Sequence, residues 1–358
     1  MVGLNISRES LRRVMDRLGY STLATLKDAA RFRIRGSVPF FGFIRRGRTT
    51  AAFMKARKLA DLFVPSSLRN GILYVCSGNI PLSYCLRDKK RGVKLVLNQN
   101  GVYYPGWYGQ DYAAANERHL AGYYRAADYI FYQSFFCEEA ARHFLGEPLC
   151  PHEILHNPVD TAFFTSESKR AFDPAAPVFL ATGNFYHEGK ATRLAFMLEA
   201  FTQVRAQLPG SRLIIAGFLA PALVAVIART GPGVSCLGPY LYEQAPALYR
   251  QGDIYLNTQF NDNCPSAVLE AMSCGLPVVH LSCGGTPELT GEAGIAVAVE
   301  QSWERFLYPE PEDYAAAMLE AVRQRDKLSA AARGRCLEKF DVRIWKARHE
   351  KIFAGMCR

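Results

Sequence analysis

The sequence lacks any hydrophobic run of the length that a membrane-spanning helix requires, about 20 residues. Its first segment, MVGLNISRESLRRVMDRLGY, has the pattern of an amphipathic helix, which we expect over residues 8–18. That segment also lacks the apolar core of a secretory signal. We therefore expect a cytoplasmic protein.

Disulfide and zinc patterns are missing as well. The ten cysteines are scattered, with no CxxC pair, and no His/Cys cluster has the spacing of a zinc site. We expect reduced thiols that fill small apolar spaces in the core.

Acidic residues are scarce at the N-terminus. Residues 1–70 hold 15 Lys and Arg against 4 Asp and Glu, whereas the rest of the chain holds 28 against 29, so the net charge of +10 originates at the N-terminus. Such an excess favours an anionic partner. The basic, aromatic segment 31–48 is compatible with an acceptor-facing surface or with anionic lipid. Nucleic acid is less compatible, because no recognised binding module accompanies the segment.

What is present is the alternation of an α/β protein. The length of 358 residues fits two domains. Short apolar runs predict two sets of parallel strands separated by helical segments. The first set covers residues 72–76, 94–98, 128–132 and 152–156, and the second covers residues 178–182, 212–217, 234–238, 253–257, 277–281 and 295–299.

Helices are expected over residues 50–63, 190–208, 265–274 and 342–357. Doubly wound sheets of this kind bind ligands at the carboxyl ends of their strands. Neither GxGxxG nor GxxxxGK[ST] occurs, which argues against dinucleotide and P-loop binding.

The most informative stretch is FNDNCPSAVLEAMSCGLPVVHLSCGGTPELTGEAGIAV (260–297). We expect Pro265 to open a helix at its first position, with free amides at Ser266 and Ala267 that suit a diphosphate. Glu270, a turn deeper, is placed to accept two hydrogen bonds from a ribose diol. Asp262, one loop outward, is placed to do the same for sugar hydroxyls.

These residues resemble the E-x7-E region of retaining GT-B glycosyltransferases of the family 4 type (glycosyl transferases group 1). Asp262 stands in the place of the first glutamate and Glu270 in the place of the second, and CGLPVV and GGTPEL match the continuation. Two more segments resemble the family: ILHNPVDTAFF (154–164), an interdomain segment, and GNFYHEGKATRLAFMLEAF (183–201), which reaches the donor diphosphate. The resemblance extends over about residues 128–358.

The resemblance implies a GT-B fold, α/β with two Rossmann-like domains facing a cleft and an atypical N-terminal domain. An acceptor-side domain with the basic segment would cover residues 1–160. The nucleotide-sugar domain would cover residues 161–340, and residues 341–358 would form a helix that packs back on the first domain.

It also implies a set of site residues. Asp262, Glu270 and Lys190 would be catalytic, and Gln99 and Asn100 would line the acceptor side. Donor binding would fall to Gly183, Asn184, Arg193, Asn263, Cys264, Pro265, Ser266 and Ala267. No metal or other cofactor is expected, because no DxD motif occurs and such enzymes use cationic side chains and helix dipoles.

The sequence departs from the family pattern at several of these positions. Asn184 replaces an arginine, Lys190 is displaced by one position, and Pro265 replaces a glycine whose amide contacts the sugar. No histidine follows strand 94–98. Arg193 is a candidate to compensate for the missing arginine.

The expected activity is transfer of a sugar from a nucleoside-diphosphate sugar to an acceptor hydroxyl, with retention, as a hexosyl-type transferase. The acceptor would be a glycan, a polysaccharide or a lipid-linked sugar, with peripheral contact to the inner face of the membrane through residues 31–48. The alternative is a catalytically eroded relative that serves as a binding module. Glu288 is expected to cap the next helix, and His156 and His187 are expected to have no role.

Overall fold

The computed structural model describes residues 40–41, 51–63, 71–76, 78–167, 170–185, 188–229 and 231–356. The expected helix over residues 8–18, segment 31–48 apart from Phe40 and Phe41, and His187 lie outside these ranges, as does the side chain of Lys190.

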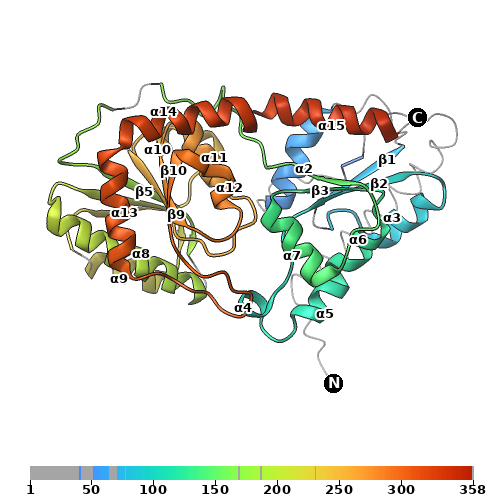
Figure 1. Ribbon diagram of the computed structural model, residues 1–358, viewed down its shortest axis with the longest axis horizontal. Helices are drawn as coiled ribbons and strands as arrows, with labels where there is room; N and C mark the ends of the chain where they lie inside the picture. Colours follow the sequence, from blue (N-terminus) through green and yellow to red (C-terminus); the bar gives the residue numbers. More distant parts are fainter. Residues whose placement is uncertain are drawn as a thin grey trace, which may run out of the picture.

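The described residues form two parallel β-sheets, each in its own α/β layer arrangement (Figure 1). In the first sheet the strand order is β1-β2-β3-β4, and Phe40 adds a parallel bridge to Leu73 at the β1 edge. Its strands are β1 (Ile72–Cys76), β2 (Lys94–Gln99), β3 (Tyr129–Tyr132) and β4 (His152–Ile154).

The second sheet has the order β10-β9-β8-β5-β6-β7. The strand order therefore reverses beside β5, which has β6 on one side and β8 on the other. Its strands are β5 (Val178–Phe185), β6 (Arg212–Leu219), β7 (Val234–Leu237), β8 (Ile254–Asn257), β9 (Val278–Leu281) and β10 (Gly294–Val297). All ten strand positions predicted from the apolar runs are confirmed. Strands that are buried on both faces need such runs, whereas the edge strands β4, β7 and β10 are only partly buried.

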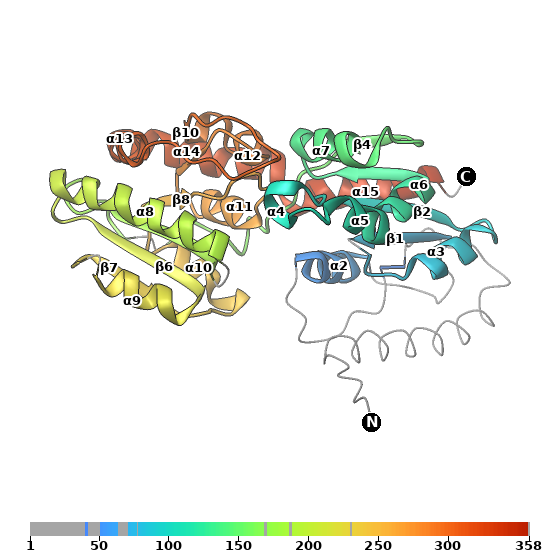
Figure 2. The same ribbon diagram turned by 90° about the horizontal axis from the view of Figure 1, so that it is seen from below.

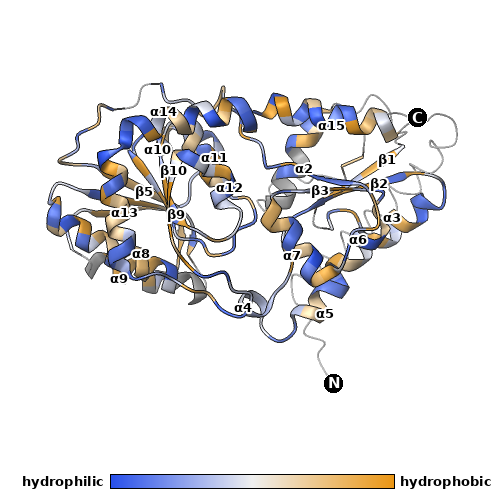
Figure 3. Cartoon of the chain, in the orientation of Figure 1, coloured by the Kyte–Doolittle hydropathy of each residue, from blue (hydrophilic) through white to orange (hydrophobic). Residues whose placement is uncertain are grey.

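Helices cover both sheets, and Figure 3 shows the hydrophobic residues concentrated on the strands and on the helix sides that face them. The helices of the first domain are α2 (Ala51–Leu62), α3 (Leu82–Lys89), α4 (Pro105–Tyr108), α5 (Tyr112–Asn116), α6 (Gly122–Ala126) and α7 (Phe135–Leu145). Those of the second are α8 (Glu188–Gln207), α9 (Pro221–Arg229), α10 (Ala245–Tyr249), α11 (Ser266–Ser273), α12 (Thr286–Thr290), α13 (Pro311–Arg323) and α14 (Arg325–Arg335). None of the described helices is long and apolar enough to span a membrane.

The chain passes between the domains twice, and the two passages are paired. Val159 donates its N–H to the Phe340 carbonyl and accepts from the Val342 N–H, at 2.9 and 3.0 Å. Helix α15 (Val342–Met356) then lies along the first domain, as Figures 1 and 2 show. Its buried His349 bonds the Tyr74 hydroxyl of β1 at 2.7 Å, so the helix packs against the sheet of the first domain.

Two finer predictions have different outcomes. Helix α11 begins at Ser266, so Pro265 is the N-cap residue and the prediction of a first-turn position was wrong. Gly275 adopts φ +73° just after the helix, a left-handed conformation that suits a glycine at a helix C-terminus. The nine cysteines within the described ranges are free thiols, as predicted.

Candidate active site

The loop between β8 and α11 lies where the strand order of the second sheet reverses, the position at which open α/β sheets bind ligands. Two glycines bring the start of α12 against this loop. The Gly285 N–H donates to the Asp262 carbonyl at 2.7 Å, and a Cβ at Gly285 would lie 2.0 Å from the Asn263 carbonyl oxygen. The Gly-Gly pair of GGTPEL is therefore required by a close backbone approach.

The start of α11 has the features of an anion site. The Pro265 side chain has no hydrogen-bond acceptor that could cap the helix. Ser266 is exposed and Ala267 is half-buried. Among the described residues, no acceptor takes the N–H of Ser266 or Ala267. These two amides and the helix dipole both favour a negatively charged group.

Glu270 lies one turn into α11 and is half-buried. One carboxylate oxygen accepts a hydrogen bond from the Tyr249 hydroxyl at 3.0 Å. Desolvation raises the pKa of Glu270 to about 7, against the opposing effects of the Tyr249 hydrogen bond and the charge of Lys58. A carboxyl group poised in this way gains from any ligand that donates hydrogen bonds to its charged form.

The other residues of this loop are drawn toward the first domain. The Asp262 carboxylate accepts from the Cys264 N–H at 3.2 Å. The Cys264 carbonyl accepts from the Asn157 side chain at 2.7 Å. The Asn263 amide lies so near Gly101 that a Cβ there would be 2.6 Å from its nitrogen. Asp262, Asn263 and Cys264 are thus fixed where the two domains meet.

The second donor segment lies at the carboxyl end of β5. Asn184 is exposed. Arg193 is 8% exposed, stacks over the Phe185 ring at 4.5 Å and donates to Gln259. A Cβ at Gly183 would lie 2.9 Å from a terminal nitrogen of Arg193. Arg193 therefore lies directly behind the Gly183 backbone, and its buried Nε has no described partner.

The two acceptor-side candidates follow β2 and differ in orientation. The buried Gln99 donates its side-chain amide to the Gly101 carbonyl at 3.1 Å. The Asn100 side-chain oxygen accepts from the Lys55 ammonium at 3.3 Å and from Gln133. Asn100 therefore belongs to a polar cluster with Lys55 and Gln133. The Gln99 side chain instead bonds the backbone of the loop that follows β2.

Two lysines of α2 also lie in this region, and neither was predicted from the sequence. Lys58 is half-buried and faces Glu270 and Asp160 across the domain boundary. Burial lowers the pKa of Lys58, and these two carboxylates oppose the shift. Lys55, one turn earlier, reaches the carboxyl end of β2. The available signal was the three-residue spacing of Lys55 and Lys58, which places both lysines on one face of the helix before β1.

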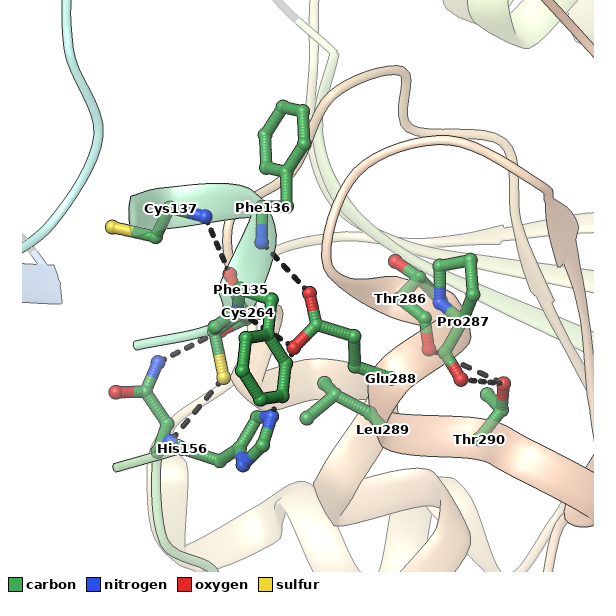
Figure 4. Close-up of polar contacts among 12 residues, drawn as sticks. Phe135, Phe136, Cys137, His156, Cys264, Thr286, Pro287, Glu288, Leu289 and Thr290 are labelled. Carbon is green, nitrogen blue, oxygen red and sulfur yellow. Dashed lines mark hydrogen bonds and ion pairs between the residues drawn. The ribbon is translucent and has the colours of Figure 1, made fainter. Parts of the chain in front are cut away.

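Glu288 connects the domains (Figure 4). From α12 its carboxylate accepts the N–H groups of Phe135 and Phe136, at 2.8 and 2.9 Å, and contacts His156 at 3.2 Å. It therefore caps α7 of the other domain, so the expectation that it caps the next helix was wrong. His156 has a structural contact here that the sequence did not indicate.

Comparisons with known proteins agree with this arrangement. Residues 176–324 match the family described as glycosyl transferases group 1. A search of curated proteins finds no match.

Among solved structures, HepE of Anabaena in complex with UDP is similar at a TM-score of 0.64 and 15% identity, covering 79% of this chain and 78% of that chain. Sucrose-phosphate synthase of Thermosynechococcus elongatus is similar at 0.61 and 12%, covering 85% and 78%. The pneumococcal O-GlcNAc transferase GtfA in complex with UDP and GlcNAc is similar at 0.61 and 12%, covering 80% and 56%. The fold is GT-B, as the sequence predicted, and the C-terminal half carries the family's sequence pattern.

Proposed function

We propose that this GT-B protein is a glycosyltransferase that moves a sugar from a nucleoside-diphosphate sugar to an acceptor hydroxyl. The observation that carries the proposal is the combination of free amides at the start of α11 with the half-buried carboxyl of Glu270 one turn later. This pair offers one site for a diphosphate and one for a ribose at adjoining positions of the same helix. The family match of residues 176–324 and the similarity to a UDP-bound structure support it.

In the proposed mechanism, the departing nucleoside diphosphate carries the largest charge that develops in the transition state. The amides of Ser266 and Ala267 and the ammonium of Lys190 stabilise that charge. Glu270 holds the ribose, and Asp262 orients the sugar from the adjoining loop. Arg193 does not contact the diphosphate directly in this mechanism. Its guanidinium lies behind Gly183 and holds the backbone of that residue in place.

The acceptor enters from the first domain. We propose a glycan, polysaccharide or lipid-linked acceptor, transfer of a hexose with retention, and no metal requirement. The Asp262–Glu270 pair in the family pattern supports retention. We also propose that the basic residues of segment 31–48 hold the protein to the cytoplasmic face of an anionic membrane. Phe40 and Phe41 take no part in this contact, because both are buried in the core of the first domain. Sedimentation with anionic and neutral vesicles at low and high salt tests the proposal.

Thermal stabilisation by UDP, GDP and ADP, free and as sugar conjugates, tests the donor site. A ligand at 100 times its dissociation constant stabilises the native state by about 2.7 kcal/mol. We expect one nucleotide to stabilise the wild type and a Glu292→Ala variant, whose exposed carboxylate lies on the same domain. The Glu270→Ala variant should lose that stabilisation. A folded wild type that responds to none of the nucleotides would favour a non-catalytic relative over an enzyme.

A further inference from the structure

Lys55 brings a positive charge to the place where the domains meet, and none of the described residues supplies an opposing charge. Its ammonium donates to the side-chain oxygens of Asn98 and Asn100, at 3.0 and 3.3 Å. Within the described part of the chain, the titratable groups that act on it are Lys58 and the thiols of Cys76, Cys137 and Cys264. Burial raises the pKa of each of these thiols to about 12, so they are neutral near pH 7.

A half-buried ammonium that no described anion neutralises is costly, because amide oxygens replace only part of its hydration. Lys58 adds like-charge repulsion, and it has carboxylates of its own in Glu270 and Asp160. The positive charge of Lys55 is therefore available to an anion that comes from outside the protein.

The amide oxygens that hold Lys55 are fixed by the core. Asn98 donates its amide nitrogen to the Tyr74 hydroxyl at 3.1 Å, and that hydroxyl bonds Nε2 of His349 at 2.7 Å. Nδ1 of His349 bonds the Trp345 carbonyl at 2.8 Å, so Nδ1 carries the proton and Nε2 accepts. Since each donor in this chain is committed, the Asn98 oxygen must face Lys55.

The opposite side of the cluster is tied to the donor loop. Gln133 donates to the Asn98 oxygen at 3.2 Å, and Asn157 donates to the Gln133 oxygen at 3.0 Å. Asn157 also donates to the carbonyl of Cys264, which lies two residues before the start of α11. Lys55 is thus held between the carboxyl ends of β2 and β3 and the loop that leads to α11.

We propose that Lys55 is an anion-binding residue of the acceptor half of the cleft, and that the acceptor is a sugar that carries a phosphate or carboxylate group. The inference rests on the proposed function in one respect, since it takes the facing α11 as the donor site. The shared chemistry is an anionic oxygen group within hydrogen-bond distance of a preorganised ammonium.

Binding of inorganic phosphate, glucose 6-phosphate and glucuronate to the full chain tests this, with glucose as the neutral control. Calorimetry is run with and without the nucleotide that stabilises the protein most. Three variants are compared: Lys55→Met, Lys190→Met in the proposed donor site, and Lys94→Met, an exposed lysine at the opposite end of β2. Loss of one charged hydrogen bond lowers affinity about tenfold or more.

We expect the dissociation constant of one anionic sugar to rise about tenfold or more in Lys55→Met and to stay unchanged in Lys94→Met. Glucose 6-phosphate and glucuronate then distinguish a phosphate from a carboxylate. The melting temperature of Lys55→Met should equal or exceed that of the wild type, because an uncompensated charge is removed.

Anion binding that survives Lys55→Met, or that is lost only in Lys190→Met, would overturn the inference. The inference would also be overturned if the wild type binds nucleotide but none of the three anions. Anion binding that depends on Lys55 in a protein that binds no nucleotide would support the anion site and refute the proposed donor function.

Discussion

Replacing Glu270 by Gln should stabilise the free protein above pH 7 while it removes the response to nucleotide. In the free protein the Glu270 carboxylate has one described hydrogen-bond donor, the Tyr249 hydroxyl, and its desolvation outweighs the attraction of Lys58. A carboxyl group that serves ligand binding is in this way held at a cost to stability. Gln keeps the shape of the side chain and removes its charge.

The size and sign of the effect follow from the pKa. Desolvation raises the pKa of Glu270 from 4.5 to about 7, so the folded state holds this proton more tightly than the unfolded chain. The contribution of this proton to the free energy of unfolding is fully present below pH 4.5 and is lost as the pH rises through 7. A shift of this size corresponds to roughly 3 kcal/mol at pH 8. Because the Gln amide also loses water, we expect a net gain of about 1–3 kcal/mol.

Thermal unfolding of the wild type, Glu270→Gln and the exposed control Glu292→Gln at pH 5 and pH 8 measures this. Each kcal/mol corresponds to about 2–4 °C for domains of this size. Glu270→Gln should differ from the wild type by about 1 kcal/mol or less at pH 5, melt clearly higher at pH 8 and show no shift with nucleotide. A difference between wild type and variant that is the same at both pH values would refute the reasoning.

Two further predictions concern the connections around the site. Glu288→Ala removes two charge-assisted hydrogen bonds from the start of α7. This variant should lower the free energy of unfolding by about 2–4 kcal/mol and increase the radius of gyration measured by small-angle scattering. Glu288→Gln should have a smaller effect on both quantities. An unchanged scattering profile and melting temperature would contradict this role. Gly285→Ala places a Cβ 2.0 Å from the Asn263 carbonyl and should cost about 1–3 kcal/mol and weaken nucleotide binding in calorimetry. Gly334→Ala, where a Cβ meets nothing, is the control, and equal behaviour of the two variants would count against the close contact.

The strands could be predicted from the sequence because each depends on a local run of apolar residues. The residues of the candidate donor site could also be proposed from the sequence, because the loop, the free amides and Glu270 fall within one short stretch of the chain. Their relative positions follow from helix geometry alone.

What the sequence did not reveal depends on how the domains meet. Lys58 and Glu270 lie on helices far apart in the chain, and no local pattern indicates that they face each other. Glu288 was expected to cap a helix and does so, but the helix belongs to the other domain. The position of Pro265 was missed by one residue, because its fixed φ suits both the N-cap and the first turn.

The most direct test of the proposed function is a crystal structure of the protein with the nucleotide that stabilises it most. We predict that the diphosphate lies on the amides of Ser266 and Ala267 and that the ribose hydroxyls donate to the Glu270 carboxylate. A nucleotide bound elsewhere, with Glu270 still bonded only to Tyr249, would contradict the proposed donor site.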